Sequence, residues 1–303
     1  MRRSLDGMST FDRYTAASEL AAGRIIAAYS TSFGAATRLL GPRHRTHVRS
    51  IYALVRVADE LVDGATAEAG IPPEAQREAL ARLEAETDGA IASGYSSNPI
   101  VHAFAHTARA AGITRELTGP FFVSMRSDLA GERADGDPLT GLDDAAHAAY
   151  VHGSAEVVGL MCLRVFLREE HRTDAQRRTL EFGARRLGAA FQNVNFLRDL
   201  ADDTERLGRS YLSADGTVDA ALQRRWIAII REQLDDAAAA LPLLPRDARI
   251  AVDCALRMFA RLAERLARTP AAQLTERRVR LSAPAKAGIV AQSALALRKE
   301  RIA

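Results

Sequence analysis

The sequence predicts an all-α fold, in which a bundle of helices surrounds a central cavity. Apolar residues recur with helical spacing along nearly the whole chain, and no segment of useful length alternates as a β-strand does. Only 10 of the 303 residues are proline, while 48% are hydrophobic. A chain of this length can bury one large core or two small ones. Because no linker or internal repeat interrupts the helical pattern, we expect a single domain over residues 1–303.

The N-terminal half is expected to contain five main helices. Residues 1–12 are expected to be a frayed, flexible start. The hydroxyl-rich run Ser30-Thr31-Ser32 can cap a short helix that ends at Gly41-Pro42. Such a helix start also suits a phosphate group, and the sequence alone does not separate this role from simple capping. The expected helices span residues 15–29, 43–63, 74–92, 99–111 and 115–130.

The C-terminal half is expected to contain five more helices, one of which is rich in small residues. Residues 143–167 hold many Ala and Gly residues, which indicate either close helix packing or a cavity wall for a long apolar ligand. The polar, Gly-rich run 131–141 before it is expected to be a mobile loop near the mouth of the site. The expected helices span residues 143–167, 173–203, 217–241, 245–268 and 284 onwards.

Composition argues against several classes of function. The 41 basic residues barely exceed the 38 acidic ones, which gives no case for a nucleic-acid partner. Cys162 and Cys254 lie in apolar helical segments and are expected to be reduced and buried, as is typical of cytosolic proteins. The sequence predicts neither a signal peptide nor a membrane span. His102 and His106 lack the glutamate of an HExxH site, so we expect a surface or core pair.

The helix expected over 173–203 ends in polar groups with helical spacing. Asn195, Asp199 and Asp203 are each four residues apart, so they share one helix face, with neighbours about 6 Å apart. Acids at this spacing repel one another, so a positive group should lie over them. Oxygen ligands on one face suit Mg²⁺, which usually keeps several waters and shares its charge with phosphates.

A similar acidic face lies about 140 residues upstream. Asp59 and Asp63 are four residues apart. Arg56 lies one turn before Asp59, and Arg198 lies beside Asp199. Alone, either motif is more typical of a solvated charged face. Together they can hold metal ions between two facing helices, because both interrupt segments that otherwise have a buried pattern.

In this order and spacing, the motifs make the chain similar to the head-to-head trans-isoprenyl diphosphate synthases, the phytoene/squalene synthase family. The resemblance covers most of the chain and is greatest to the bacterial phytoene synthases. A single DxxxD motif is weak evidence, whereas the ordered set is specific. The matching segments are 29–33 (YSTSF), 51–63 (IYALVRVADELVD), 150–159, 192–203 and 208–212 (GRSYL).

The resemblance implies an isoprenoid-synthase-type bundle that condenses two molecules of geranylgeranyl diphosphate head to head. A cyclopropylcarbinyl (prephytoene) diphosphate would form first and would then give phytoene, with release of diphosphate. The family also implies Mg²⁺ as the cofactor, with Mn²⁺ as a substitute, and no NADPH. The implied metal ligands are Asp59, Asp63, Asn195, Asp199 and Asp203.

The resemblance also implies which residues contact the substrate and which take part in the reaction. The implied substrate and diphosphate contacts are Tyr29, Ser30, Ser32, Phe33, Tyr52, Arg56, Gln192, Arg198 and Tyr211. The implied catalytic residues are Arg56, Asp59, Asp63, Tyr150, Asp199 and Asp203.

Two positions depart from the family pattern. Tyr29 stands where the family often has His, and Glu156 falls in a segment where it has Ala-Gly-Thr-Val-Gly. If Glu156 faces the cavity, it would alter the metal or cation chemistry; if it faces a neighbouring helix, it can pair with an Arg. The departures leave the substrate open. The alternative is a squalene-type synthase (presqualene, hydroxysqualene or dehydrosqualene) that acts on farnesyl diphosphate.

Three classes outside this reaction are also alternatives. A head-to-tail prenyltransferase or terpene cyclase would show a DDxxD-like run, whereas this chain has DxxxD twice. A carboxylate-bridged di-iron bundle needs a Glu three residues before a His, which none of the seven histidines has. A non-catalytic interaction protein would not need these oxygens and arginines in register.

Long apolar substrates and products lead us to expect a cytoplasmic enzyme, with peripheral contact to the inner face of the cell membrane left open. The basic segment 277–280 and the last helix are the candidate membrane-facing elements. A solvated face and neutralisation of diphosphate are the alternatives for that segment. Downstream carotenoid enzymes are candidate partners.

Overall fold

The computed structural model describes residues 7–130, 141–201, 210–213 and 217–302, apart from the side chains of residues 63, 67, 130 and 296–302. The all-α prediction is confirmed, since the described residues form helices and no strand. The loop expected at 131–141 lies, except for residue 141, outside the described residues. The helices are α1 (Thr10–Tyr29), α2 (Thr31–Thr37), α3 (Pro42–Asp63), α4 (Ala65–Glu68), α5 (Pro73–Ser93), α6 (Pro99–Ala111), α7 (Arg115–Ala130), α8 (Asp144–Val151), the π-helical turn η1 (His152–Glu156), α9 (Val157–Leu167), α10 (Asp174–Arg198), α12 (Ala220–Ala240), the 3₁₀ turn η2 (Leu241–Leu243), α13 (Arg246–Arg268), α14 (Ala271–Leu274) and α15 (Ala283–Ile302).

Local capping signals explain why most helix boundaries agree with the sequence pattern. Pro42 and Pro99 open α3 and α6 in the first helical turn, where a backbone N–H has no intrahelical partner to lose. Ser9 accepts a hydrogen bond from Asp12 N at 3.0 Å. Because this cap lies further upstream than the apolar pattern indicates, α1 begins at Thr10 rather than near residue 15.

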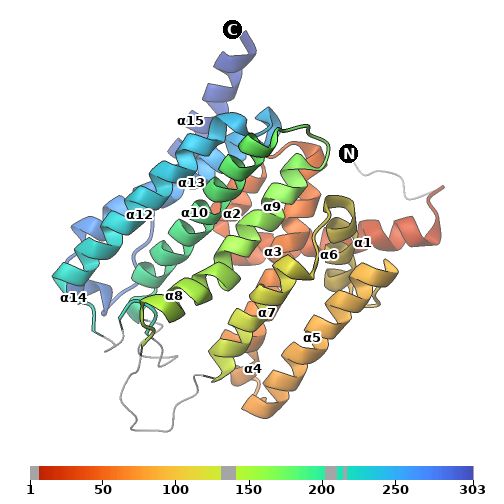
Figure 1. Ribbon diagram of the computed structural model, residues 1–303, viewed down its shortest axis with the longest axis horizontal. Coiled ribbons are helices and arrows are strands. Elements are labelled where there is room, and N and C mark those ends of the chain that lie inside the picture. Colours follow the sequence, from red (N-terminus) through yellow and green to blue (C-terminus); the bar gives the residue numbers. More distant parts are fainter. Residues whose placement is uncertain (1–6, 131–140, 202–209, 214–216, 303) are drawn as a thin grey trace.

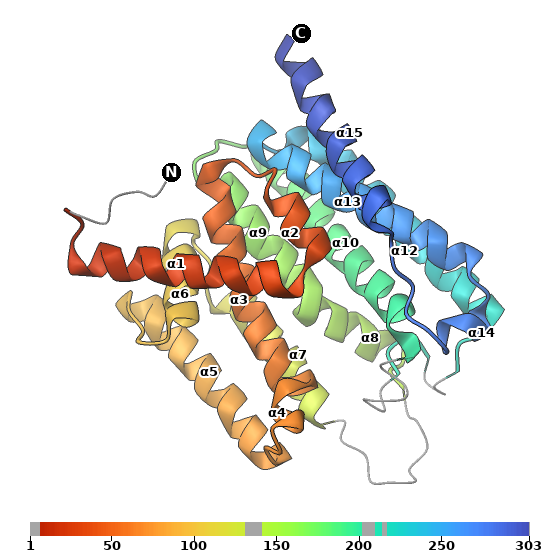
Figure 2. The same ribbon diagram turned by 180° about the vertical axis from the view of Figure 1, so that it is seen from behind.

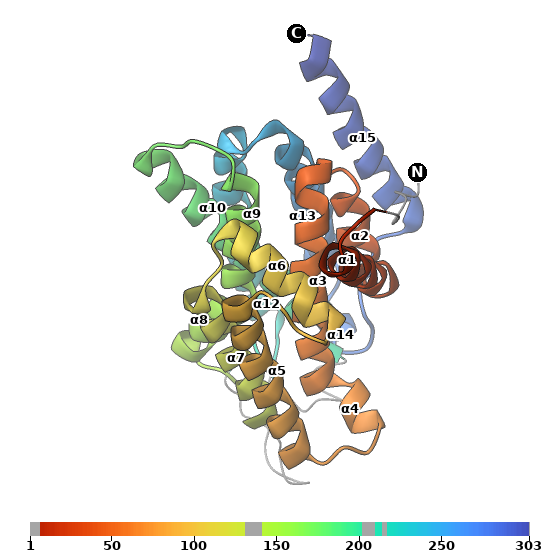
Figure 3. The same cartoon turned by 90° about the vertical axis from the view of Figure 1, so that its right-hand side faces the viewer.

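Two long helices, α3 and α10, lie on opposite sides of the interior, and the other helices cover them (Figures 1 and 2). The helices α1, α5, α6 and α7 pack around α3, whereas α12 and α13 pack against α10. The helix α9 contacts both α3 and α10 and so joins the two halves. The last helix, α15, packs on α13 and α2, and its C-terminal end extends beyond the bundle (Figure 3).

The apolar core has two parts that follow these two halves. One part surrounds α3, α6, α7 and α9 and includes the fully buried rings of Phe104, Phe121 and Phe122. The other surrounds α10, α12 and α13 and includes Trp226 and Phe259. Side chains of both parts line one cavity, so the cavity lies where the two halves of the core meet.

The helix predicted over 143–167 is wrong in one respect, because a π-helical turn divides it into α8 and α9. Within this turn the N–H of Val157 donates to His152 O, five residues back. Gly153 lies so close to α7 that a Cβ atom would be 2.0 Å from Ser124 Oγ and 2.3 Å from Pro120 O. Close packing therefore accounts for part of the small-residue pattern. Ser154 and Ala155 line the cavity, so other small residues of this segment form part of its wall.

By length and composition, the run Asp144–Leu167 could also cross a membrane. Half of its apolar stretch is buried inside the bundle, where α7 and α10 pack against it. Both cysteines are free; Cys254 is buried, and Cys162 faces the cavity.

The two histidines at helical spacing have separate structural partners. His102 is buried and its Nε2 lies 2.9 Å from Thr15 Oγ1. His106 Nδ1 lies 3.2 Å from Glu19, whose carboxylate raises the pKa of His106. The expected surface or core pair is confirmed.

Candidate active site

A deep cavity of about 840 Å³ lies between α2, α3, α9, α10 and α13. Along α10 its lining runs from Leu180 to Arg198, which at 1.5 Å per residue spans roughly 27 Å. Apolar side chains form most of the wall. We call the charged end the mouth; it is lined by Arg56, Asp59, Asn195, Arg198, Arg278, Arg280 and Lys286.

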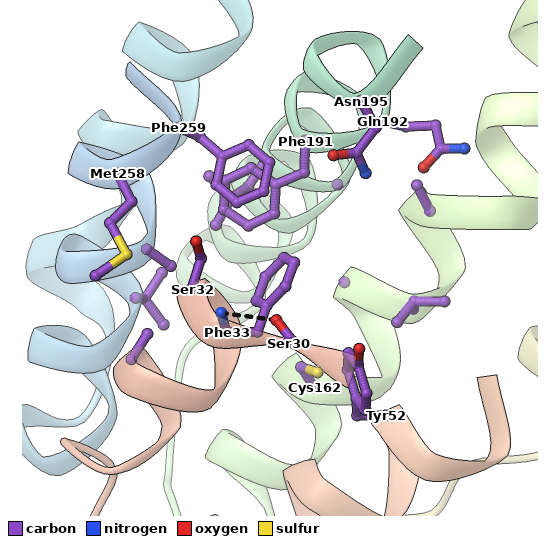
Figure 4. A pocket seen from close by; sticks show the side chains of 18 of the residues that line it. Ser30, Ser32, Phe33, Tyr52, Cys162, Phe191, Gln192, Asn195, Met258 and Phe259 are labelled. Atoms are coloured by element: carbon purple, nitrogen blue, oxygen red, sulfur yellow. Dashed lines mark hydrogen bonds between the residues drawn. The ribbon is translucent and has the colours of Figure 1, made fainter. Parts of the chain in front are cut away.

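Aromatic rings from three helices form one part of the wall (Figure 4). The Phe191 and Phe259 rings stack with centroids 3.9 Å apart, and the Phe33 ring lies 5.4 Å from each. Tyr52 follows at 6.5 Å from Phe33, and burial raises the pKa of its phenol. Phe191 is therefore part of the cavity wall rather than only core, and the rings offer π faces to a cation.

The first acidic face lies at the C-terminal end of α3. Arg56 Nη1 donates to Asp59 Oδ2 at 2.6 Å, and Arg56 Nη2 donates to Glu60. The guanidinium also lies over the ring of Tyr29, with Cζ 4.4 Å from the ring centre. Burial acts to lower the pKa of Arg56, but the two carboxylates outweigh burial and raise it. Asp63 ends α3, and its side chain lies outside the described residues.

The second acidic face lies at the C-terminal end of α10, which ends at Arg198. The sequence pattern predicts that the helix continues to residue 203; residues 200 and 201 are helical again after the break at Asp199, and residues 202 and 203 lie outside the described residues. Asp199 leaves helical geometry, with φ −101° and ψ 11°. Its carboxylate is held from two sides: Arg198 Nε donates to Oδ1 at 2.8 Å, and Arg278 Nε lies 2.6 Å from the same oxygen. The Asp199 N–H still donates to Asn195 O at 2.8 Å, so Asp199 stays one turn beyond Asn195. Asp203 lies outside the described residues.

Asn195 provides the observation that tests whether a metal fits. Its Oδ1 atom is buried and has no hydrogen-bond partner among the residues that the structure describes, and the residue lines the mouth. An unsatisfied buried oxygen is costly, and a hard cation would satisfy it. Asp59 lines the same mouth, and Asp199 lies one helical turn beyond Asn195, so these oxygens suit Mg²⁺. Within the described part of the chain, no three acidic, His or Cys side chains form a metal-binding group by themselves.

The remaining predicted residues lie around the same cavity. Ser30 Oγ accepts a hydrogen bond from Phe33 N at 3.1 Å, which confirms the predicted cap of α2 (Figure 4). Asp199 and Tyr211 do not line the cavity but contact residues that do. The predicted site residues that line the cavity are Tyr29, Ser30, Ser32, Phe33, Tyr52, Arg56, Asp59, Tyr150, Gln192, Asn195 and Arg198.

Three cations at the mouth were not among the residues predicted for the site. Arg278, Arg280 and Lys286 all line it, and Lys286 Nζ donates to Thr31 Oγ1 at 2.6 Å. Burial, with Arg198 and Arg280 nearby, lowers the pKa of Lys286. The sequence left three interpretations open for the basic segment 277–280: contact with a membrane, a solvated face, or neutralisation of diphosphate. Its position at the mouth agrees with the third. A compositional signal existed for Lys286, because the chain has only two lysines.

Glu156 faces a neighbouring helix rather than the cavity. Its carboxylate lies 3.0 Å from His152 Nδ1 and 3.7 Å from Arg185 Nη1 on α10. Of the two interpretations that the sequence left open, the structure therefore favours pairing with an arginine. The segment around Glu156 departs from the family pattern without placing a carboxylate in the cavity.

The model of the squalene/phytoene synthase family matches residues 26–285, which include both acidic faces and the basic segment. The chain belongs to this family. It is 32% identical over 223 residues to a phytoene synthase of Pseudescherichia vulneris, a match that covers 69% of this chain and 67% of that protein. It is 32% identical over 187 residues to a 15-cis-phytoene synthase of Paracoccus sp., covering 61% and 57%. A phytoene synthase of Rhodobacter capsulatus is 28% identical over 284 residues, covering 88% and 78%.

Solved structures of family members share the fold. A dehydrosqualene synthase superimposes with a TM-score of 0.75 at 20% identity, covering 96% of this chain and all of that one (100%). A squalene synthase from Alicyclobacillus acidocaldarius superimposes with a TM-score of 0.67 at 17% identity, covering 84% and 96%. The isoprenoid-synthase-type bundle expected from the sequence is confirmed. For some of the relatives found by sequence, the matched region is less than two thirds of their length.

Proposed function

We propose that this family member is a Mg²⁺-dependent prenyltransferase that condenses two molecules of geranylgeranyl diphosphate head to head into phytoene. A cyclopropylcarbinyl (prephytoene) diphosphate is the intermediate, and diphosphate is released. One observation carries the proposal: the ends of α3 and α10, each with an acid and an arginine, lie at the mouth of one long apolar cavity. The phytoene synthases among its relatives support this choice of reaction.

The cations of the mouth bind the diphosphate group and stabilise its departure. Diphosphate is a poor leaving group until its charge is neutralised, and guanidinium groups suit phosphate oxygens because they donate two parallel hydrogen bonds. Arg198 and Arg278 pair with Asp199. Both also line the mouth, so each can exchange part of this pairing for a phosphate oxygen.

Mg²⁺, when bound, supplies positive charge that neutralises the leaving diphosphate. Asp59, Asn195 and Asp199 are the described residues that would hold it, and the unsatisfied Asn195 Oδ1 is the structural support for this assignment. Asp63 and Asp203 complete the proposed ligand set, on the basis of the sequence motifs alone.

The interior protects the cation that remains after diphosphate leaves. An allylic cation survives only where water is excluded, and the wall is mostly apolar. The stacked rings of Phe191 and Phe259 present their faces to a cation. The long apolar lining of α10 accommodates the hydrocarbon tails.

A second candidate is head-to-head condensation of farnesyl diphosphate to a squalene-type product. Two solved structures with the same fold, a dehydrosqualene synthase and a squalene synthase, support it. Both candidates use the same mouth and differ in how much of the cavity the tails fill. A cytoplasmic location, with or without peripheral membrane contact, stays a prediction of the sequence.

Product analysis tests the proposal. The purified protein is incubated with labelled geranylgeranyl diphosphate or farnesyl diphosphate, with Mg²⁺, and with or without NADPH. We expect a 40-carbon hydrocarbon from geranylgeranyl diphosphate without NADPH, lost with EDTA and restored by Mg²⁺ or Mn²⁺. A 30-carbon product made only from farnesyl diphosphate would move the assignment to the second candidate. No product from either substrate would overturn both.

A further inference from the structure

Tyr29, one of the two positions that depart from the family pattern, lies at a joint that two helices hold. It is the last residue of α1, and the next residue, Ser30, is the cap of α2. The Ser30 N–H donates to Ile26 O at 3.0 Å, and Ser30 Oγ accepts from Phe33 N at 3.1 Å. The fold therefore determines where the backbone of Tyr29 lies, and the residue lines the cavity.

The ring of Tyr29 lies against the guanidinium group of Arg56 on α3. The Arg56 Cζ atom is 4.4 Å from the ring centre, within the range of a cation–π contact. Two carboxylates hold the same guanidinium at its Nη atoms: Nη1 donates to Asp59 Oδ2 at 2.6 Å, and Nη2 donates to Glu60. Arg56 thus has two charged partners and one uncharged partner.

The uncharged partner differs from the other two in its effect on a bound anion. A carboxylate that positions an arginine also offsets its positive charge, which weakens the attraction between the arginine and a phosphate group. An aromatic face attracts a cation through its quadrupole and carries no net charge. A histidine, which the family often has at this position, would repel Arg56 once it was protonated. Tyr29 can therefore hold Arg56 at the mouth without offsetting its charge.

We propose that Tyr29 is a positioning residue, which acts through Arg56: its ring holds the guanidinium at the mouth, where Arg56 binds the diphosphate group. This inference rests on the proposed function, which assigns diphosphate to the cations of the mouth. It assigns the effect to the face of the ring and not to the phenol hydroxyl group.

The test compares Tyr29→Leu, Tyr29→Phe, Arg56→Ala and the double variant Tyr29→Leu/Arg56→Ala. Calorimetry measures the affinity for inorganic diphosphate in EDTA, without metal, and turnover with Mg²⁺ gives kcat/KM. We expect Tyr29→Leu to lower both by about two- to fivefold, the value of a partly exposed cation–π contact. Tyr29→Phe keeps the ring and should recover most of this loss. Tyr29→Leu should have no further effect once Arg56 is replaced by alanine.

Phe182→Leu is the matched control. The Phe182 ring also lies beside a guanidinium group, with Arg186 Cζ 5.8 Å from the ring centre, and neither residue lines the cavity. The two rings have similar exposure, since Phe182 is 53% and Tyr29 is 49% exposed. Phe182→Leu should leave the affinity for diphosphate and kcat/KM unchanged. If Tyr29 were merely structural, Tyr29→Leu would lower the unfolding temperature and leave the affinity per folded molecule unchanged, which would overturn the inference.

Two further results would overturn the positioning role. Equal losses in Tyr29→Phe and Tyr29→Leu would show that the hydroxyl group, and not the ring, is needed. A loss that persists in the double variant would show that the ring acts independently of Arg56. If the unmodified protein converts neither prenyl diphosphate, the proposed function fails, and the positioning role is judged by the affinity for inorganic diphosphate alone. If the unmodified protein does not bind inorganic diphosphate either, the positioning role fails as well.

Discussion

Clusters of arginine and carboxylate lie at both ends of α3, and the two ends use the same groups differently. At the N-terminal end, Arg43 Nε donates to Asp247 Oδ2 at 2.8 Å and Arg43 Nη2 donates to Glu170 at 2.7 Å. At the C-terminal end, Arg56 pairs with Asp59 beside the cavity. Side-chain composition alone would not separate these clusters.

The N-terminal cluster is closed on itself. Arg168 Nη1 donates to His44 Nδ1 at 3.1 Å, so His44 carries its proton on Nε2 and donates it to Asp247 at 3.2 Å. Burial lowers the pKa of His44, in agreement with a neutral ring. Gly41 packs so tightly there that a Cβ atom would lie 2.6 Å from Asp247 Oδ2. Both oxygens of this carboxylate accept hydrogen bonds from within the cluster.

The mouth differs in two respects. It opens into the cavity, and Asn195 Oδ1 is buried there with no hydrogen-bond partner in the described part of the chain. Cations also gather there, including Arg278 and Lys286 from the C-terminal part of the chain. The comparison teaches how to separate the two kinds of cluster. Where the charged groups hydrogen-bond to one another, the cluster is structural; where a buried oxygen beside a cavity lacks a hydrogen bond, the cluster is a candidate binding site.

The largest effect is expected from Asp199→Asn at the mouth. Loss of the charge should lower turnover by about 10³-fold or more, because stabilisation of the leaving diphosphate is the main contribution to catalysis. The thermal unfolding temperature should change little, since Arg198 and Arg278 can turn to solvent. Product formation and thermal unfolding are measured on the same samples. Near-full turnover in Asp199→Asn would refute the metal-site hypothesis.

The second-largest effect is expected from Arg278→Ala, with the adjacent Arg277 as the control position. Arg278 contacts Asp199 and lines the mouth, whereas Arg277 donates to Gln273 at 2.8 Å and does not line it. Arg278→Ala should lower kcat/KM by about 10- to 100-fold, the value of a hydrogen bond to a charged group. Arg277→Ala is the matched control and should change kcat/KM less than about twofold. Equal losses in both variants would mean that overall charge, not the mouth, determines binding.

In the cluster at the N-terminal end of α3, Asp247→Asn should reduce the stability of the fold and leave turnover per folded molecule unchanged. Its hydrogen bond to Arg43 lowers the pKa of Asp247 from 3.8 to about 2. A lowered pKa stabilises the fold above the ordinary pKa, and this stabilisation is lost as pH falls from about 4 to about 2. Since the side chain is 37% exposed, we expect about 1 kcal/mol from the charge rather than the full value of the shift.

Urea unfolding of both proteins as a function of pH measures this contribution. The difference in midpoint should be largest above pH 4 and should shrink toward pH 2. A difference that persists unchanged at pH 2 would show that the carboxylate acts through shape rather than charge. A loss of kcat at neutral pH would show that the two clusters are coupled.

The smallest effect concerns Lys286. Because burial lowers its pKa, this lysine loses its charge at a lower pH than an exposed one. The affinity for inorganic diphosphate with Mg²⁺, measured by calorimetry, should therefore fall as pH rises through that pKa. Lys286→Arg should remove this dependence, and Lys286→Gln should bind about three- to tenfold more weakly at neutral pH. Identical pH profiles for the wild type and Lys286→Arg would exclude Lys286 from the binding of diphosphate.

Features encoded by neighbours in the chain could be predicted without the structure. The bounds of α3, α5 and α6 follow from proline at their first turns and from helical periodicity. The pairing of Arg56 with Asp59 follows from their spacing of one turn, because helix geometry alone brings them together. The ordered motifs determined the family, and most of the site residues that they predicted line the cavity.

Other features depend on residues that are far apart in the sequence. Arg278 meets Asp199 across 79 positions, and Tyr211 meets Asp128 across 83. The break after Arg198 and the π turn at 152–156 were also not predicted from the local pattern. No local pattern encodes such contacts, since they exist only once the helices pack. The sequence by itself determined the fold class, the family and the two acidic faces; the tertiary structure decided which cations reach the mouth and which carboxylate accepts a hydrogen bond from Tyr150.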